Sequence, residues 1–169
     1  WKINCINIRR ACYVFQLEKF LERGSLYKVF FSATLIKILL TWILSAIISI
    51  YDETLLSNPI DNESSLFVFC VTILVAPLIE TFLFQYSVFA IGDKYKAHTN
   101  LSIAVSTLLF GLAHHYNMVY VFATLLSGLF YAYLFAKIKR RESGFMACLI
   151  VALIHACNNL FGWCIIMIQ

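Results

Sequence analysis

Apolar residues form long uninterrupted runs along this chain. The runs predict five helices, at residues 26–50, 66–91, 101–114, 119–136 and 145–168. A helix rises about 1.5 Å per residue and a hydrocarbon core is about 30 Å thick, so the third run is too short to cross it. Transmembrane β-barrels show instead segments of about ten residues in which apolar and polar positions alternate. The pattern therefore predicts an all-α, polytopic bundle of transmembrane helices.

The basic residues predict an orientation for this bundle. Twelve of the thirteen lysines and arginines lie before or at the start of the first run, between the second and third runs, or between the fourth and fifth. The other two connections, 52–65 and 115–117, contain neither residue type. Because cytoplasmic loops are enriched in lysine and arginine, we expect the N-terminus in the cytoplasm and the C-terminus outside. The thirteenth basic residue, Lys37, lies inside the first run.

Composition narrows the class of protein. Hydrophobic residues make up 62% of the chain and charged residues 13%. In soluble domains about 45–50% of residues are apolar and about 25% are charged. With a mean hydropathy of +0.82, a soluble domain, a disordered chain and a fibrous protein are excluded, and the lipid bilayer is the first expected partner. The net charge of +4 is small, and basic residues beside a first membrane helix are expected anyway, so no nucleic-acid partner is predicted. The six cysteines contain no Cys-x-x-Cys pair and are interpreted as small packing residues.

The chain is expected to have three parts. Residues 1–25 form a cytoplasmic or interfacial segment, 26–65 the first transmembrane helix with an outer loop, and 66–169 a helix bundle that carries the chemistry. Apolar spacing within 11–23 indicates a helix along the membrane surface that ends at Gly24, and a plain amphipathic linker explains it equally well. The basic region and the apolar run after it are both too long for a signal peptide.

Polar side chains occur at depths where they are costly. Glu80 lies in the middle of the second run, His114 ends the third, and His155 lies within the fifth, one turn before Asn159. An ionisable group at the centre of a membrane helix costs at least about 2.5–3.5 kcal/mol. At about 1.5 Å per residue, Glu80, His155 and His114 lie about 16, 18 and 21 Å from the basic ends of their helices. They are therefore predicted to meet at one level of the bundle.

Each of these residues also has a structural interpretation. In this interpretation Glu80 is a structural acid paired with Lys37 or a histidine, and His114 is a hydrogen-bonded residue of the core. An interhelical hydrogen-bonded clamp accounts for His155 with Asn159. The coincidence of all three at one depth favours a functional site over these separate explanations.

Two features concern the packing around such a site. Pro77, three residues before Glu80, removes a backbone donor and is predicted to displace the carbonyl of Ile73 and loosen the helix there. The 115–117 turn is expected to lie below the outer surface, covered by protein. Close packing of the fourth helix is predicted from small residues at every fourth position, Gly128, Ala132 and Ala136.

One carboxylate, two imidazoles and a carboxamide in a dry site suit hydrolysis by an activated water. The carboxylate takes the proton of the water with help from one histidine, and the other histidine and the amide stabilise the oxyanion. The same carboxylate and histidines would also suit a catalytic zinc ion with an open fourth position. Since no His-Glu-x-x-His sequence is present, the residues alone do not choose between a metal and a metal-free glutamate base.

Three motifs carry a family resemblance. The first motif is Glu-Glu-x-x-x-Arg after Ala-Pro, and the chain reads APLIETFLFQ at 76–85. The second is Phe-x-x-x-His, which matches Phe110–His114, and the third is His-x-x-x-Asn, which matches His155–Asn159. These are motifs of the CAAX protease and bacteriocin-processing (CPBP, or Abi) family of intramembrane glutamic endopeptidases. The Ras-converting CAAX prenyl proteases are its eukaryotic relatives. The resemblance spans about residues 66–161.

This resemblance implies an intramembrane endopeptidase that cuts a membrane-associated peptide or protein, opens toward the cytoplasm and uses no metal or other cofactor. It implies that Glu80 is the general base, that His114 helps to activate the water, and that His155 and Asn159 form the oxyanion hole. The expected location is a multi-pass position in a bacterial cytoplasmic membrane.

Two positions depart from the first motif. Thr81 stands where the motif has its second Glu, and Gln85 stands where it has Arg. A glutamine offers only a neutral hydrogen bond in place of a guanidinium. These departures keep open a second hypothesis, a non-proteolytic membrane scaffold or a bacteriocin-immunity-type protein.

Overall fold

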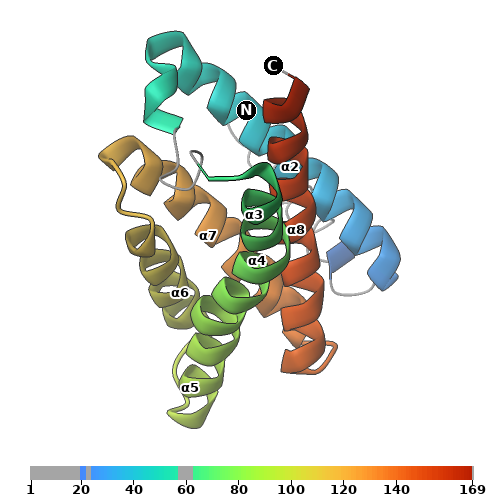
Figure 1. Ribbon diagram of the computed structural model, residues 1–169. Helices are drawn as coiled ribbons and strands as arrows, with labels where there is room; N and C mark the ends of the chain where they lie inside the picture. Colours follow the sequence, from blue (N-terminus) through green and yellow to red (C-terminus); the bar gives the residue numbers. More distant parts are fainter. Residues whose placement is uncertain (1–19, 22–23, 57–62, 169) are drawn as a thin grey trace, which may run out of the picture.

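The computed structural model describes residues 20–21, 24–56 and 63–168, and every regular element within them is helical (Figure 1). Four elements are separate helices, α2 (Leu26–Tyr51), α6 (Thr99–Ala113), α7 (Met118–Lys139) and α8 (Gly144–Ile168). A short 3₁₀ turn, η1, covers Glu53–Leu56. One long helix lies between η1 and α6 along the chain. It has five segments: α3 (Ser65–Phe69), η2 (Cys70–Val75), α4 (Ala76–Glu80), η3 (Thr81–Ser87) and α5 (Val88–Lys94). We call Ser65–Lys94 the composite helix.

The all-α membrane bundle predicted from the apolar runs is confirmed. Within the described residues, α2, the composite helix, α7 and α8 are long and apolar enough to cross a membrane. As predicted, α6 is shorter, with 15 residues. The observed helix ends differ from the predicted ends by at most three residues. The surface helix predicted at 11–23 falls outside the described residues, apart from a fragment at 20–21.

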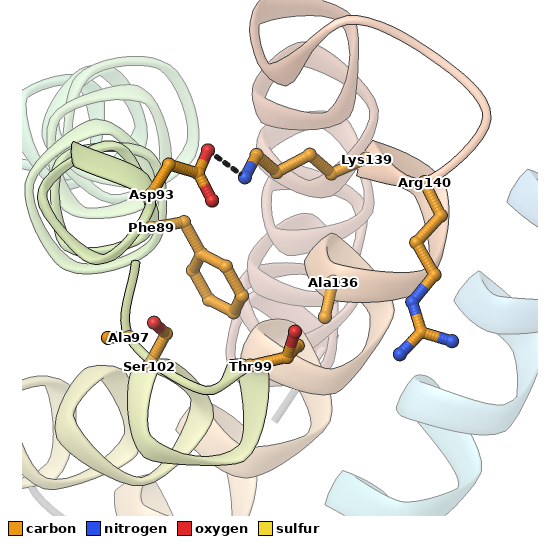
Figure 2. Close-up of a pocket in the computed structure, with 8 residues that line it drawn as sticks. All are labelled: Phe89, Asp93, Ala97, Thr99, Ser102, Ala136, Lys139 and Arg140. Carbon is orange, nitrogen blue, oxygen red and sulfur yellow. Dashed lines mark hydrogen bonds and ion pairs between the residues drawn. The ribbon is translucent and has the colours of Figure 1, made fainter. Parts of the chain in front are cut away.

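Three basic segments of the chain lie at one end of the bundle. Arg141, between α7 and α8, donates from Nη1 to the carbonyls of Gly24 and Leu21. Lys139, at the end of α7, forms an ion pair with Asp93 at the end of α5 (Figure 2). These contacts bring together the start of α2 and the α5–α6 and α7–α8 connections, as the alternating helices require.

The opposite end contains the two connections without basic residues. Asn117 Nδ2 donates to the carbonyl of Leu55 over 3.0 Å, so η1 contacts the α6–α7 turn. Asn117 Oδ1 accepts from the N–H of Tyr120 over 2.8 Å and caps α7. Tyr116 remains 45% exposed, so protein covers this turn only in part.

Helix α7 packs against α6 and α8 and carries much of the buried core (Figure 1). Tyr131 and Phe135 are at most 1% exposed. A Cβ atom added at Gly128 would lie 3.1 Å from the side chain of Phe110 on α6. Ala132 and Ala136, one and two turns later, are buried. The small-residue face predicted for this helix is therefore a packing face, as expected.

Candidate active site

Glu80 lies between two π-helical segments of the composite helix. η2 precedes α4, which ends at Glu80, and η3 follows directly. π-Helical turns are rare and are often found at functional sites. The N–H of Ala76 donates to the carbonyl five residues earlier. In this register the carbonyl left without a backbone donor by Pro77 is that of Thr72. The α-helical spacing assumed from the sequence predicted Ile73 instead.

Asn159 supplies the donor that the composite helix lacks at this point. Its Nδ2 donates to the carbonyl of Thr72 over 2.8 Å. The contact ties α8 to η2, so Asn159 is an interhelical clamp, one of the two roles considered from the sequence. A carboxamide has two N–H groups, and this contact uses one of them.

The structure brings the carboxylate and both histidines together. Glu80 Oε1 lies 3.8 Å from His114 Nε2, and Glu80 Oε2 lies 3.8 Å from His155 Nε2. The side chains are 22%, 15% and 7% exposed. Each carboxylate oxygen thus faces one imidazole, at a separation longer than a direct hydrogen bond. The meeting of these three residues at one level agrees with the depth argument.

His114 has a defined orientation because its own helix holds it. It is the C-cap of α6, and its Nδ1 lies 2.8 Å from the carbonyl oxygen of Phe110. A carbonyl oxygen only accepts, so Nδ1 must carry the proton of this hydrogen bond. A neutral His114 therefore presents the lone pair of Nε2 to Glu80. Two acceptors that face each other at 3.8 Å suit a shared donor placed between them.

His155 is held by aromatic rings. Its ring stacks on Tyr131 with a centroid distance of 4.7 Å and lies 5.8 Å from the Phe110 ring. Its Nδ1 is buried without a hydrogen-bond partner among the described residues. The sequence did not single out Tyr131, because an aromatic residue in an apolar membrane helix carries no distinguishing signal. Its place beside the small-residue face of α7 is the one weak indication.

Lys37 does not pair with Glu80, which removes one structural interpretation of the carboxylate. Its side chain is buried and its Nζ donates to Thr41 Oγ1 over 2.5 Å and to Asn158 Oδ1 over 3.5 Å. Asn158 lies next to Asn159, about 100° further around α8. Its side chain does face α2, although its Nδ2 lies 3.5 Å from Asn159 Oδ1.

The two residues that depart from the family motif are fully buried. Gln85 Nε2 donates to Ser106 Oγ over 3.5 Å, so Gln85 joins η3 to α6. Gln85 Oε1 and Thr81 Oγ1 have no hydrogen-bond partner among the described residues. A neutral pair thus occupies the place of the motif's acid and base, and it is only partly hydrogen-bonded.

Among the described residues, no group of three His, Cys, Asp or Glu side chains is arranged to hold a metal ion. What the arrangement offers is a carboxylate between two imidazoles, with an amide donor one helical turn from His155. Such a set can move protons and stabilise an oxyanion.

Comparison with known proteins identifies a family. Residues 62–161 match the family model described as type II CAAX prenyl endopeptidase Rce1-like. The matched region contains the whole composite helix, all of α6 and α7, and most of α8. Helix α2 lies outside it. No curated protein and no solved structure was found to match the chain. The four long apolar helices are those of an integral, multi-pass membrane protein. The chain belongs to the Rce1-like type II CAAX prenyl endopeptidases, a family of membrane proteases.

Proposed function

We propose that this protein is an intramembrane endopeptidase that hydrolyses a peptide bond of a membrane-associated protein or peptide with a water activated by Glu80. The observation that carries the proposal is the position of the Glu80 carboxylate between His114 and His155, 3.8 Å from each. Membership in a family of CAAX-type endopeptidases supports the reaction class.

The first step takes place beside Glu80 Oε1 and His114 Nε2, which face each other at 3.8 Å. A water there donates one hydrogen to the carboxylate and the other to the Nε2 lone pair of His114. As the water oxygen attacks the peptide carbonyl carbon, one of its protons passes to Glu80, which acts as general base. The bond from Nδ1 of His114 to the Phe110 carbonyl keeps the Nε2 lone pair turned toward this water.

The second step concerns the charge that forms on the attacked carbonyl. A neutral His155 with its proton on Nε2 and the free N–H of Asn159 donate to this oxyanion. When the carbon–nitrogen bond breaks, the proton held by Glu80 passes to the leaving amine and the carboxylate is regenerated. These residues complete the cycle without a metal ion. The low exposure of the three side chains favours the reaction, since electrostatic stabilisation is larger where water is scarce.

The experiment compares wild-type protein with Glu80→Gln, which keeps the shape of the side chain and removes the base. Each form is produced in cells that lack the endogenous gene, and the membrane peptides are quantified by mass spectrometry. We expect an uncut precursor to accumulate with Glu80→Gln while its product disappears. The protein level in the membrane should not change.

Glu63→Gln is the matched control, because Glu63 is exposed at the end of the bundle near α3. It should process the precursor like wild type. Equal processing by wild type and Glu80→Gln would refute the proposal and would favour a non-proteolytic scaffold or immunity-type role. If purified wild-type protein lost cleavage on chelation and regained it with added zinc, the metal-free part of the proposal would be wrong.

A further inference from the structure

Lys37 is a buried cation on α2, the helix outside the family match. It is 4% exposed and forms no ion pair with a described carboxylate. A charged group inside a membrane helix is costly and usually has a functional reason. The contacts of its ammonium group indicate what that reason is.

The first contact is with the amide of Asn158. Thr41 Oγ1 donates to Asn158 Oδ1 over 2.9 Å, and Lys37 Nζ lies 3.5 Å from the same oxygen and 2.5 Å from Thr41 Oγ1. The lysine has only donors to offer, and it faces the amide together with the hydroxyl. Two donors on one atom identify that atom as the oxygen, so the NH₂ group of Asn158 must point the other way.

Asn158 transmits this orientation to its neighbour. Its Nδ2 lies 3.5 Å from Asn159 Oδ1, and Asn159 Nδ2 donates to the Thr72 carbonyl. The Asn159 oxygen is therefore turned toward Asn158. Its NH₂ group is turned toward the composite helix, which also carries Glu80. A flipped Asn159 would place its oxygen against the Thr72 carbonyl and would turn its NH₂ group toward Asn158, away from the composite helix.

A second contact leads from Lys37 to His155. The ammonium lies 5.4 Å from the centroid of the Tyr131 ring, within the range of a cation–π interaction. The same ring stacks on His155 with a centroid distance of 4.7 Å. Lys37 thus reaches both proposed oxyanion donors through one intermediate residue each.

We propose that Lys37 and Thr41 are positioning residues that orient the Asn159 amide through Asn158. The α2 helix thereby completes a site whose reacting groups all lie in the matched region. The effect of this relay on cleavage rests on the proposed function, whereas the orientation itself does not.

The kinetic test uses Lys37→Met and Thr41→Val, which keep side-chain volume and remove the donors. The matched controls on the same helix are Lys28→Met, an exposed lysine, and Thr34→Val, whose hydroxyl has no described partner. The probe is a peptide spanning the cleavage site of the precursor that accumulates with Glu80→Gln. We expect kcat to fall at least about 10-fold, less than the 10²–10³-fold typical of removing an oxyanion donor, with KM changed less than about 3-fold.

Thr41→Ser keeps the hydroxyl donor and should restore most of the wild-type kcat. A loss of kcat in the control variants equal to that of Lys37→Met would refute a specific role of the relay. The same conclusion would follow if Thr41→Ser were as slow as Thr41→Val.

A second readout does not need activity. Protein with ¹⁵N-labelled asparagine in lipid nanodiscs gives side-chain amide resonances, and the Asn159 signal is the one absent from Asn159→Ala. We expect this signal to shift in Lys37→Met and Thr41→Val and to stay in place in Lys28→Met and Thr34→Val. An unmoved signal would overturn the relay even if kcat fell, and a moved signal with unchanged kcat would overturn its role in catalysis.

The two proposals fail in different ways. If no Glu80-dependent cleavage exists, the proposed function is wrong, and the amide resonance alone decides whether the relay orients Asn159.

Discussion

At the scale of single residues, the candidate site is held mainly by groups that do not react. The Phe110 carbonyl orients His114, the Tyr131 ring supports His155, and the Thr72 carbonyl binds Asn159. Glu80 itself has only long contacts to the two imidazoles. The carboxylate thus makes no short hydrogen bond to either imidazole, while both rings stay oriented.

The role of His114 can be tested with His114→Gln. Glutamine keeps a polar side chain but cannot share a proton of the attacking water as imidazole does, so kcat should fall by about 10²–10⁴-fold. KM should change little, since His114 contacts the water and not the rest of the substrate. His115→Gln, at the exposed neighbouring position, is the control in the same cleavage assay. Similar rates for the two variants would argue against a role of His114 in activating water.

At the scale of helices, the approach of α6 to α7 determines where Phe110 and His114 lie. Gly128 permits this approach, because a Cβ there would already lie 3.1 Å from two atoms of the Phe110 side chain. The composite helix contributes a second feature, since its π-helical register leaves the Thr72 carbonyl for Asn159. The first feature depends on the packing of two consecutive helices, whereas the second joins Asn159 to Thr72, 87 positions away.

Gly128→Val is expected to destabilise the α6–α7 contact by about 1–3 kcal/mol through overpacking. Gly162→Val is the matched control, because a Cβ at Gly162 meets no atom within 4 Å. Thermal unfolding in detergent should show a lower midpoint for Gly128→Val only. The cleavage rate should fall with it, since Phe110 positions both imidazoles. A Gly128→Val protein as stable as wild type would show that the helices can separate without cost.

At the scale of the whole molecule, the bundle has two chemically different ends. The basic segments meet at one end through the contacts of Arg141 and Lys139, and η1 meets the α6–α7 turn at the other. The positive-inside rule predicts that the basic end faces the cytoplasm. This orientation, the bacterial cytoplasmic membrane as the location and the three-part division of the chain remain predictions.

Cysteine labelling tests the orientation. In a background with the native cysteines replaced by serine, Glu63→Cys and Asn100→Cys place a thiol at exposed positions of opposite ends. A membrane-impermeant maleimide added to intact cells should label Glu63→Cys and should label Asn100→Cys only after the membrane is opened. The reverse pattern would place the basic end outside.

The sequence by itself determined the class of protein, the helices and the four candidate residues. These follow from local chemistry: apolar runs of membrane-spanning length predict helices, and a carboxylate or imidazole within such a run stands out because its burial is costly. The departures at Thr81 and Gln85 were equally visible. All of this information lies within a few residues of the position concerned.

Only the tertiary structure decided how these residues are paired. Lys37 was a possible partner of Glu80 in the sequence, whereas in the structure it binds Thr41 and Asn158, the latter 121 positions away. For Asn159 the sequence left two roles open, an oxyanion donor and an interhelical clamp, and the structure shows that it binds the Thr72 carbonyl, where the helix passes Pro77 in a π register. Partners of this kind depend on how helices rotate and approach one another, and the packing of the whole bundle sets both.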